Sequence, residues 1–161
     1  MVEFRSAALE DFKGLAQFKR DIHVMHLEHV RDVFRDVQEP LALEELQGII
    51  AGKDGRGAYV LLDNGRLAGY AFTKVIESRS HPLIIDQKVL FIEDMYIGRE
   101  LRRKGYGRQL MNGLKQIATN SECGSILLDV WEWNKGAIAF YEALGLQSTT
   151  IRMKLRVQPQ R

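Results

Sequence analysis

The sequence predicts an α/β fold with a mixed β-sheet, and three patterns lead to that prediction. Asn64-Gly65 lies between two apolar, strand-like runs, and this dipeptide favours a tight hairpin turn. Residues 89–131 have the pattern of strand, helix and strand, which favours a right-handed parallel crossover. Helical patterns also precede and follow these segments. We expect helices to flank a central sheet of about six to seven strands.

Strands are predicted where apolar and polar residues alternate, or where β-branched residues gather between turn residues. Residues 77–87, which contain Ser-Arg-Ser-His-Pro, are expected to form a loop between two strands. The expected strands are residues 2–5, 58–62, 67–76, 88–97, 125–131 and 146–157.

Helices are predicted by apolar residues at spacings of three, four or seven. Ser6 is a candidate N-cap for the first helix, with Glu10 and Asp11 near the positive end of its dipole. A change of phase near residues 26–29 predicts a second helical piece, which Pro40 ends. The expected helices are residues 9–25, 30–37, 43–50, 105–119 and 134–144, with Gly52 and Gly145 as stops.

The length of 161 residues, the 45% hydrophobic content and the net charge of +2 are ordinary for one globular domain, residues 1–161. That charge is too small to indicate nucleic acid, and no apolar run reaches the roughly 18 residues of a membrane span. The first residues lack the apolar region of a secretory signal. A single cysteine, Cys123, cannot form an intramolecular disulfide. We therefore expect a cytoplasmic protein that binds neither nucleic acid nor a membrane, with Cys123 as a structural thiol.

A basic turn, Arg102-Arg103-Lys104-Gly105-Tyr106-Gly107, precedes a predicted helix. Its glycines permit a tight turn with converging N–H groups, and the helix adds the positive end of its dipole. This arrangement suits a pyrophosphate, and Arg99 and Arg108 add charge. The alternative is an exposed basic turn that only caps the helix. A dinucleotide-binding turn is disfavoured, because Leu110 stands where its third glycine would fall.

Glu93 and Asp94 are adjacent acids in the middle of an apolar strand. Neighbouring strand residues point to opposite faces, so the two carboxylates can serve one site only if the strand bulges there. Burying an unpaired carboxylate costs roughly several kcal/mol, so these acids require partners. They form either a base or cation-binding site, or one acid pairs with an arginine and the other is exposed.

The segment Trp131-Glu132-Trp133-Asn134 begins the last predicted helix, and Asn134 has the residue type of an N-cap. Phe140 is expected in the core. The tyrosine beside it, Tyr141, fits either the core or a site. The tryptophans either pack together or form the wall of a ligand pocket.

Two of these motifs resemble those of the GNAT superfamily of acyl-CoA-dependent N-acetyltransferases. The basic turn matches its Arg/Gln-x-x-Gly-x-Gly/Ala signature. Residues 134–146 are similar to its Asn-x-x-Ala-x-x-Phe-Tyr-x-x-x-Gly-Phe helix, with Leu146 in place of the final Phe. The likeness extends through the helix pair, the hairpin and the strand order, so it covers nearly the whole chain. The Ile-Glu-Asp strand and the Glu-Trp-Asn turn look most like the polyamine N-acetyltransferase branch.

The resemblance implies a role for each matching residue. Glu93, with Asp94 beside it, would hold and deprotonate an amine, and Tyr141 would protonate the departing thiolate. The N–H of Met95 would face the thioester oxygen. The acetyl-CoA site would be formed by the backbone of Arg102, Arg103, Lys104, Gly105, Tyr106, Gly107 and Arg108 around the pyrophosphate, by Met95, Tyr96 and Ile97 along the pantetheine arm, and by Asn134 beside it.

These roles predict an enzyme that moves the acetyl group of acetyl-CoA to a primary amine in a ternary complex. The amine is expected to be a small molecule, polyamine-like or other. No metal and no covalent enzyme intermediate are required. Two alternatives stay open: a protein lysine or N-terminal acetyltransferase, and a CoA-binding regulatory module without catalysis. A homodimer is common in the resembled family, and nothing in the sequence tests it.

Three histidines, His23, His26 and His29, are spaced by three in a helical region. Metal-binding pairs more often use a spacing of four, and no further ligand type accompanies them. They are interpreted as a polar helix face. The resemblance implies that this face borders the acceptor pocket.

Overall fold

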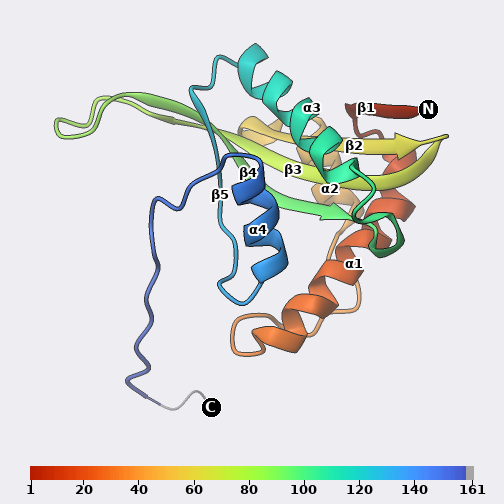
Figure 1. Ribbon diagram of the computed structural model, residues 1–161, viewed down its shortest axis with the longest axis horizontal. Coiled ribbons are helices and arrows are strands. Elements are labelled where there is room, and N and C mark those ends of the chain that lie inside the picture. The colour runs from red at the N-terminus through yellow and green to blue at the C-terminus, as the bar shows by residue number, and fades with distance from the viewer. Residues whose placement is uncertain (159–161) are drawn as a thin grey trace.

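The computed structural model describes residues 1–158 and contains a five-stranded sheet in the order β1-β2-β3-β4-β5 (Figure 1). Neighbouring strands are antiparallel from β1 to β4, whereas β4 and β5 are parallel. The predicted mixed sheet is therefore confirmed. The strands are β1 Val2–Ser6, β2 Arg56–Asp63, β3 Arg66–Ser78, β4 Gln87–Ile97 and β5 Ser125–Leu128.

The predicted hairpin joins β2 to β3, where Asp63 pairs with Arg66. Asn64 and Gly65 have φ angles of 48° and 76°, the left-handed values that a tight hairpin turn requires. Asparagine and glycine adopt such angles at little cost, which explains why these two residues determine where the chain reverses.

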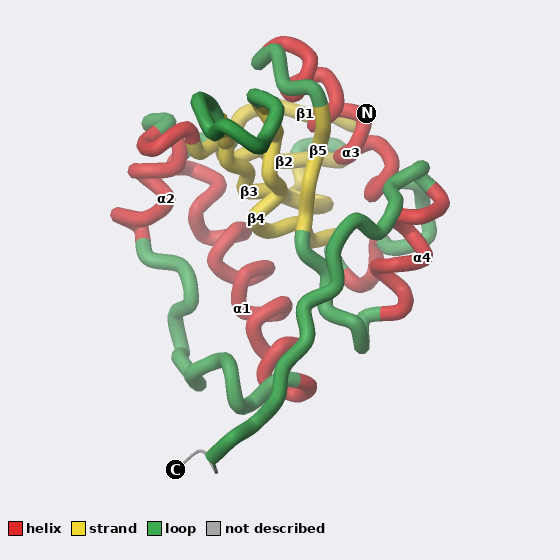
Figure 2. The backbone as a smooth tube through the Cα atoms, turned by 90° about the vertical axis from the view of Figure 1, so that its left-hand side faces the viewer, coloured by secondary structure: helices red, strands yellow, loops and turns green. Residues whose placement is uncertain are grey.

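Helices cover both faces of the sheet: α1 and α2 lie on one side, and α3 and α4 lie on the other (Figure 2). Apolar side chains of α1 and α2, including Leu15 and Leu46, pack with Val60 and Tyr70 in one core cluster. On the other face α3 contributes Leu110, Met111 and Leu114 to a second cluster, which contains Leu90 of β4. Each such burial contributes roughly 2 kcal/mol. The α-helices are α1 Phe12–His29, α2 Leu43–Ile50, α3 Tyr106–Asn120 and α4 Lys135–Ala143, and short 3-10 turns cover Leu9–Asp11, Lys53–Gly55 and Arg99–Leu101.

The start of the first helical segment differs from the prediction. Ser6 is the last residue of β1 rather than an N-cap. The chain instead enters the 3-10 turn through Ala8, whose N–H donates to the Asp11 carboxylate at 2.8 Å. Arg5 forms an ion pair with the same carboxylate at 2.8 Å. An acid held by both an N–H group and an arginine replaces the serine cap that the sequence predicted.

The predicted helix over residues 30–37 is also wrong. α1 ends at His29, and the chain continues through turns and loop until α2. Phe34 of this segment packs against α1, where its ring stacks on His26 with centroids 4.9 Å apart, whereas Val33 and Val37 are exposed. Tertiary packing of an aromatic ring has therefore overridden a local helical pattern.

The predicted last strand, residues 146–157, pairs with no other strand in the described part of the chain. It leaves α4 as an extended segment that runs away from the sheet (Figure 1). β5 also ends at Leu128, three residues earlier than expected. The described sheet therefore has five strands instead of six or seven. We call residues 146–158 the C-terminal arm.

Within residues 1–158, no helix is both long enough and apolar enough to cross a lipid bilayer.

Candidate active site

Strands β4 and β5 separate partway along their length. β5 pairs with β4 only from Val89 to Ile92, whereas β4 continues to Ile97. Residues 93–97 therefore have β3 on one edge, and on the other edge they have no strand among the described residues. Peptide groups on an unpaired strand edge are available to an extended ligand. The predicted pantetheine-binding residues, Met95, Tyr96 and Ile97, all lie in this segment.

A β-bulge lies at the acidic pair. In the pairing of β3 with β4, Phe72 lies opposite Asp94 and Thr73 lies opposite Ile92, so Glu93 has no partner residue. An extra residue of this kind reverses the alternation of side chains beyond it. Both carboxylates consequently face the α1–α2 side of the sheet, which is the condition for sharing one site.

The two acids nevertheless have different partners. Glu93 accepts a hydrogen bond from Arg56 Nε at 2.8 Å, and Arg56 also lies 3.8 Å from Glu45 of α2. Asp94 forms an ion pair with Lys19 of α1 and accepts a hydrogen bond from the Tyr70 hydroxyl at 2.7 Å. The Asp94 side chain is 9% exposed and that of Glu93 is 29% exposed. Asp94 is thus the more buried carboxylate and has both a cation and a hydroxyl as partners.

Two tyrosine hydroxyls lie within the electrostatic influence of Asp94. Burial, together with the Asp94 charge and hydrogen bond, raises the pKa of Tyr70 well above its usual value. Burial raises the pKa of Tyr141 to about 12, and the charge of Asp94 adds to that rise. Both hydroxyls are therefore protonated at neutral pH and act as donors. Tyr141 of α4 is one of the predicted catalytic residues. The fold brings it close enough to Asp94 for that charge to affect its pKa.

His26 is a candidate site residue whose role the sequence did not resolve. Burial lowers the pKa of His26, and the nearby Asp94 charge only partly opposes that effect. The imidazole is therefore neutral at pH 7 and can accept a proton. The spacing of three histidines indicated a polar helix face, whereas the structure half-buries this one among aromatic rings, beside the carboxylate.

Aromatic rings from three segments meet beside His26. The ring of His29 stacks on Trp133 with centroids 3.9 Å apart, and Phe34 meets Trp131 edge-on at 5.9 Å. Trp133 Nε1 is buried without a hydrogen-bond partner among the described residues. A buried donor without a partner in a wall of rings indicates a place where a polar ligand atom or water can bind. The aromatic cluster comprises His23, His26, His29, Phe34, Trp131 and Trp133.

The glycine turn leads into α3, a helix of 15 residues. Gly105, with φ of 86°, is its N-cap, and the first helical hydrogen bond runs from the N–H of Gln109 to the carbonyl of Gly105. The N–H groups of the first helical residues, which precede this hydrogen bond, have no partner within the helix and lie at the positive end of its dipole. A Cβ at Gly105 would meet nothing within 4 Å, whereas one at Gly107 would lie 2.9 Å from Phe140. Gly105 therefore leaves open space for an anion, and Gly107 allows Phe140 of α4 to approach the start of α3.

The basic side chains of this turn divide into two groups. Arg102 is used internally: its Nε donates to the Ile97 carbonyl at 3.2 Å, and its guanidinium lies 5.2 Å from the Tyr96 ring centroid. Arg103, Lys104 and Arg108 are exposed and form no ion pair within residues 1–158. The second group has cationic charge available for phosphates.

Tyr106 and Asn134 have structural contacts of their own. The Tyr106 hydroxyl donates to Asp63 at 2.6 Å, which ties the start of α3 to the β2–β3 hairpin. Asn134 Oδ1 accepts from the N–H of Ala137 at 3.2 Å, which confirms it as the N-cap of α4. Their predicted contacts with a cofactor would therefore involve other atoms than these.

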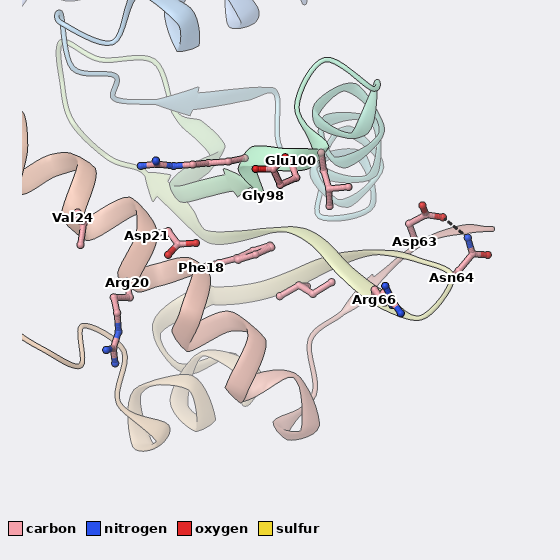
Figure 3. Close-up of a pocket in the computed structure, with 12 residues that line it drawn as sticks. Phe18, Arg20, Asp21, Val24, Asp63, Asn64, Arg66, Gly98 and Glu100 are labelled. Atoms are coloured by element: carbon pink, nitrogen blue, oxygen red, sulfur yellow. Dashed lines mark hydrogen bonds between the residues drawn. The ribbon is translucent and has the colours of Figure 1, made fainter.

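A hollow of about 1040 Å³ lies between α1, the β2–β3 turn and residues 98–101. Figure 3 shows Arg20 and Asp21 on one side of it, with Asp63 and Arg66 on the other. Side chains of both signs line it, and the acidic pair and Tyr141 do not. The hollow is therefore separate from Glu93 and Asp94. Because both positive and negative side chains line it, it favours neither an anionic nor a cationic ligand.

No group of three histidine, cysteine, aspartate or glutamate side chains in residues 1–158 is arranged to hold a metal ion. Burial raises the pKa of the half-buried Cys123 thiol, which disfavours the reactive thiolate.

Comparison with known proteins identifies the family. The family model described as "Acetyltransferase (GNAT) family" matches residues 23–146. The chain belongs to the GNAT family of acetyltransferases. This result confirms the family predicted from the glycine turn and the α4 motif.

Curated relatives of this GNAT protein match parts of it. The thialysine N-epsilon-acetyltransferase of Bos taurus is 34% identical over 61 residues, which are 38% of this chain and 36% of that protein. The [Ribosomal protein bS18]-alanine N-acetyltransferase of Escherichia coli K12 is 31% identical over 94 residues, 58% of this chain and 57% of that protein. The chain therefore spans between about a third and three fifths of the length of these relatives.

A solved structure matches nearly the whole GNAT chain. A crystal structure of a BH1408 protein variant from Bacillus halodurans superimposes with a TM-score of 0.92 at 23% identity, covering 97% of this chain and 99% of the other. At that identity the likeness establishes the fold alone, and it agrees with the predicted α/β architecture.

Proposed function

We propose that this protein transfers the acetyl group of acetyl-CoA to a primary amine, with Glu93, Asp94 and Tyr141 as its catalytic residues. One observation carries the proposal. The bulge at Glu93 turns two neighbouring carboxylates to one face, at the point where β4 loses its partner strand β5. A cation-binding group and an unpaired strand edge thus adjoin, which is what an ammonium substrate and an extended thioester require.

The residues present fit acetyl-CoA. The open space at Gly105, the N-terminus of α3 and the exposed Arg103, Lys104 and Arg108 suit its pyrophosphate and further phosphates. The unpaired edge formed by Met95, Tyr96 and Ile97 suits the pantetheine arm, and we expect Asn134 to contact the same arm. When bound there, acetyl-CoA supplies an activated acyl group.

Glu93 and Asp94 attract the amine. An alkylamine has a pKa of about 10, so it arrives as an ammonium ion that cannot attack a carbonyl. Asp94 already accepts a hydrogen bond from Tyr70 and pairs with Lys19, so its carboxylate is placed to anchor positive charge. Glu93 is the more exposed of the two and accepts the proton directly or through water.

His26 offers a second acceptor for that proton. Its imidazole is neutral at pH 7 because burial lowers its pKa, so the ring can accept a proton. The nearby charge of Asp94 would stabilise the imidazolium that forms. Asp94 would then position the ammonium while His26 removes its proton.

Tyr141 assists the leaving group. Its pKa of about 12 keeps the hydroxyl protonated, while the thiol of the product has a pKa of about 8.5. Complete proton transfer to the thiolate is therefore uphill, and the hydroxyl stabilises the departing sulfur chiefly by donating a hydrogen bond. The N–H of Met95 would meet the negative charge that develops on the carbonyl oxygen.

The aromatic cluster favours a small amine as the acceptor. Rings such as Trp133 and Phe34 attract alkylammonium groups through cation–π contacts, and His26 of the same cluster lies within the electrostatic influence of Asp94. The thialysine relative carries a small amine in its name, whereas the bS18 relative names a protein alanine. A peptide N-terminus is therefore the second candidate.

The test is thiol release from acetyl-CoA with a panel of polyamines, lysine analogues, aminoglycosides and alanine-terminated peptides. We expect turnover with at least one small amine, and loss of most of it in Asp94→Asn. Turnover only with peptides would make the protein-modifying alternative correct. CoA binding in calorimetry without thiol release would identify a regulatory module. Absence of CoA binding at millimolar concentration would refute the proposal.

A further inference from the structure

The indole N–H of Trp133 is a buried donor without a partner. Its Nε1 atom is shielded from solvent and meets no hydrogen-bond acceptor among residues 1–158. Leaving such a donor unpaired is costly, so folded proteins rarely bury one unless a further group pairs with it. A second unpartnered polar atom, His23 Nε2, belongs to the same aromatic cluster through the contact of its ring with Phe34. Two such atoms in one cluster indicate that a ligand completes their hydrogen bonds.

The surrounding structure prevents the Trp133 ring from turning toward an acceptor of its own. The indole stacks on His29 with ring planes 8° apart. His29 is itself held, because its Nδ1 donates to the carbonyl of Met25 at 2.9 Å. The backbone is also fixed, since the N–H of Asn134 donates to the Trp131 carbonyl at 2.9 Å in the turn before α4. A preorganised ring therefore presents the N–H to a ligand.

This donor lies beside the proposed amine site. The ring of His26 meets Trp133 edge-on with centroids 6.2 Å apart, and the same imidazole is close enough to Asp94 for that charge to affect its pKa. His26 thus links the two groups. They require opposite chemistry from a ligand, because the Asp94 carboxylate binds a hydrogen-bond donor whereas the indole N–H binds an acceptor. One small molecule with both kinds of group satisfies both.

This requirement distinguishes between classes of amine. Alkyl polyamines have amines with a pKa of about 10, so at neutral pH their nitrogens are protonated donors without a free lone pair. They pair with Asp94 but cannot accept from Trp133. A hydroxyl, carbonyl or carboxylate oxygen accepts that hydrogen bond. Such an oxygen is also a better partner than water, because a buried water usually makes about three hydrogen bonds and the neighbours of this indole are mostly rings.

We propose that Trp133 determines acceptor specificity, and that the acceptor is a small amine that also carries an oxygen hydrogen-bond acceptor, as amino acids and amino alcohols do. The ammonium binds at Asp94, and the oxygen accepts from Trp133 Nε1. The aromatic faces still attract the ammonium, since a ring is negative on its face and positive at its edge. This inference rests on the proposed acetyl transfer and specifies its substrate. It makes alkyl polyamines poor acceptors, although the sequence motifs look most like the polyamine branch.

The first test compares amines that differ by one oxygen-bearing group. Lysine is cadaverine with a carboxylate, and aminopentanol is pentylamine with a terminal hydroxyl. Thiol release from acetyl-CoA at neutral pH gives kcat/KM for each amine. We expect the oxygen-bearing member of at least one pair to react about tenfold better or more, chiefly through a lower KM. Equal values within both pairs, or a preference for cadaverine and pentylamine, would overturn the proposal.

The second test removes the N–H group and keeps an aromatic ring. In Trp133→Phe we expect the preference to fall to about twofold or less, because KM rises for the oxygen-bearing amine. The matched control is Trp131→Phe in the same turn, where the indole is 37% exposed. It should keep the preference, whatever it does to the overall rate. Circular dichroism checks that both variants are folded. A preference that survives in Trp133→Phe, or that both variants lose alike, would refute the role of Trp133.

A third measurement does not require catalysis. The chain has two tryptophans, so its nitrogen–proton NMR spectrum should contain two indole signals, and Trp133→Phe identifies the one that belongs to Trp133. In the presence of CoA, lysine or aminopentanol should move this signal downfield, as a new hydrogen bond does, and cadaverine should move it less. No shift with either oxygen-bearing amine would contradict the proposal. A shift without thiol release from any amine would support the oxygen site and refute the acetyl transfer alone.

Discussion

Lys19 of α1 forms an ion pair with Asp94 of β4, across 75 residues of sequence. The proposed acceptor carboxylate therefore already holds a primary alkylammonium, one supplied by the protein itself. The Lys19 ammonium also lies 5.9 Å from the centroid of the Phe72 ring. A substrate amine must either displace this group or bind beside it, on the side of Glu93. This relationship leads to the first prediction.

Replacement of Lys19 by methionine should lower the KM for the amine. Methionine keeps much of the apolar length of lysine but removes the charge that competes for Asp94. We expect a decrease of about three- to tenfold, equivalent to roughly 0.7–1.4 kcal/mol. Steady-state kinetics at saturating acetyl-CoA measure it. The control is Lys13→Met, which changes an exposed lysine at the start of α1. An increase in KM would instead show that Lys19 organises the site.

Removal of the Tyr141 hydroxyl should slow turnover without weakening the cofactor complex. In Tyr141→Phe we expect kcat to fall by about 10²-fold or more, typical of a lost hydrogen-bond donor to developing negative charge, while KM for acetyl-CoA changes less than twofold. Because the pKa of Tyr141 is about 12, its ionisation should add no alkaline limb to the rate profile below pH 10. An unchanged kcat would remove Tyr141 from the mechanism.

His26 should make stability depend on pH. Its pKa is lowered in the folded protein, so between that pKa and about 6.5 the unfolded chain binds more protons than the folded one. Stability therefore falls as the pH drops below about 6.5, until the folded-state pKa is passed. Thermal unfolding from pH 5 to 8 measures this change, and His26→Gln should flatten it.

The control for this prediction is His81→Gln, in the exposed loop between β3 and β4. It should leave the pH dependence of unfolding as in the wild type. If the two histidine variants behave alike, burial of His26 has no effect on its protonation. In the activity profile His26→Gln should also move or remove the acid limb, provided that His26 accepts the substrate proton.

Gly113 should tolerate no side chain, although it lies within α3. A Cβ there would be 2.5 Å from the Phe4 ring of β1. Overpacking of this kind costs roughly 1–3 kcal/mol, more than the ~1 kcal/mol that alanine adds in helix propensity. Denaturant unfolding of Gly113→Ala should therefore show a loss of stability. Gly48→Ala in α2 has only an ordinary contact, 3.8 Å from Lys53, and should be neutral or stabilising.

Features that depend on a few neighbouring residues were predictable from the sequence. The Asn64-Gly65 turn, the N-cap at Asn134 and the start of α3 at the glycine turn all occur where expected. Each follows from backbone angles or hydrogen bonds that nearby residues determine by themselves. The family motifs consist of the same local features, so recognition of the family came with them.

Features that depend on pairing across the chain were not predictable. The helical pattern of residues 30–37 gave way to the packing of Phe34 on His26, and the strand-like residues 146–157 found no partner strand in the described part of the molecule. In both segments the local pattern was a real preference. For residues 30–37, contacts with distant residues contributed more free energy than that preference, which is small for each residue, whereas for residues 146–157 no described strand lies beside the segment to pair with it.

The acidic pair illustrates this division most clearly. The residue pattern alone predicts that Glu93 and Asp94 are neighbours in an apolar strand and require partners. The bulge in β4, the identity of the partners Arg56 and Lys19, and the separation of β5 from β4 just beyond become visible only in the folded protein. Strand register is set by the packing of whole faces of a sheet, so no short stretch of sequence contains it.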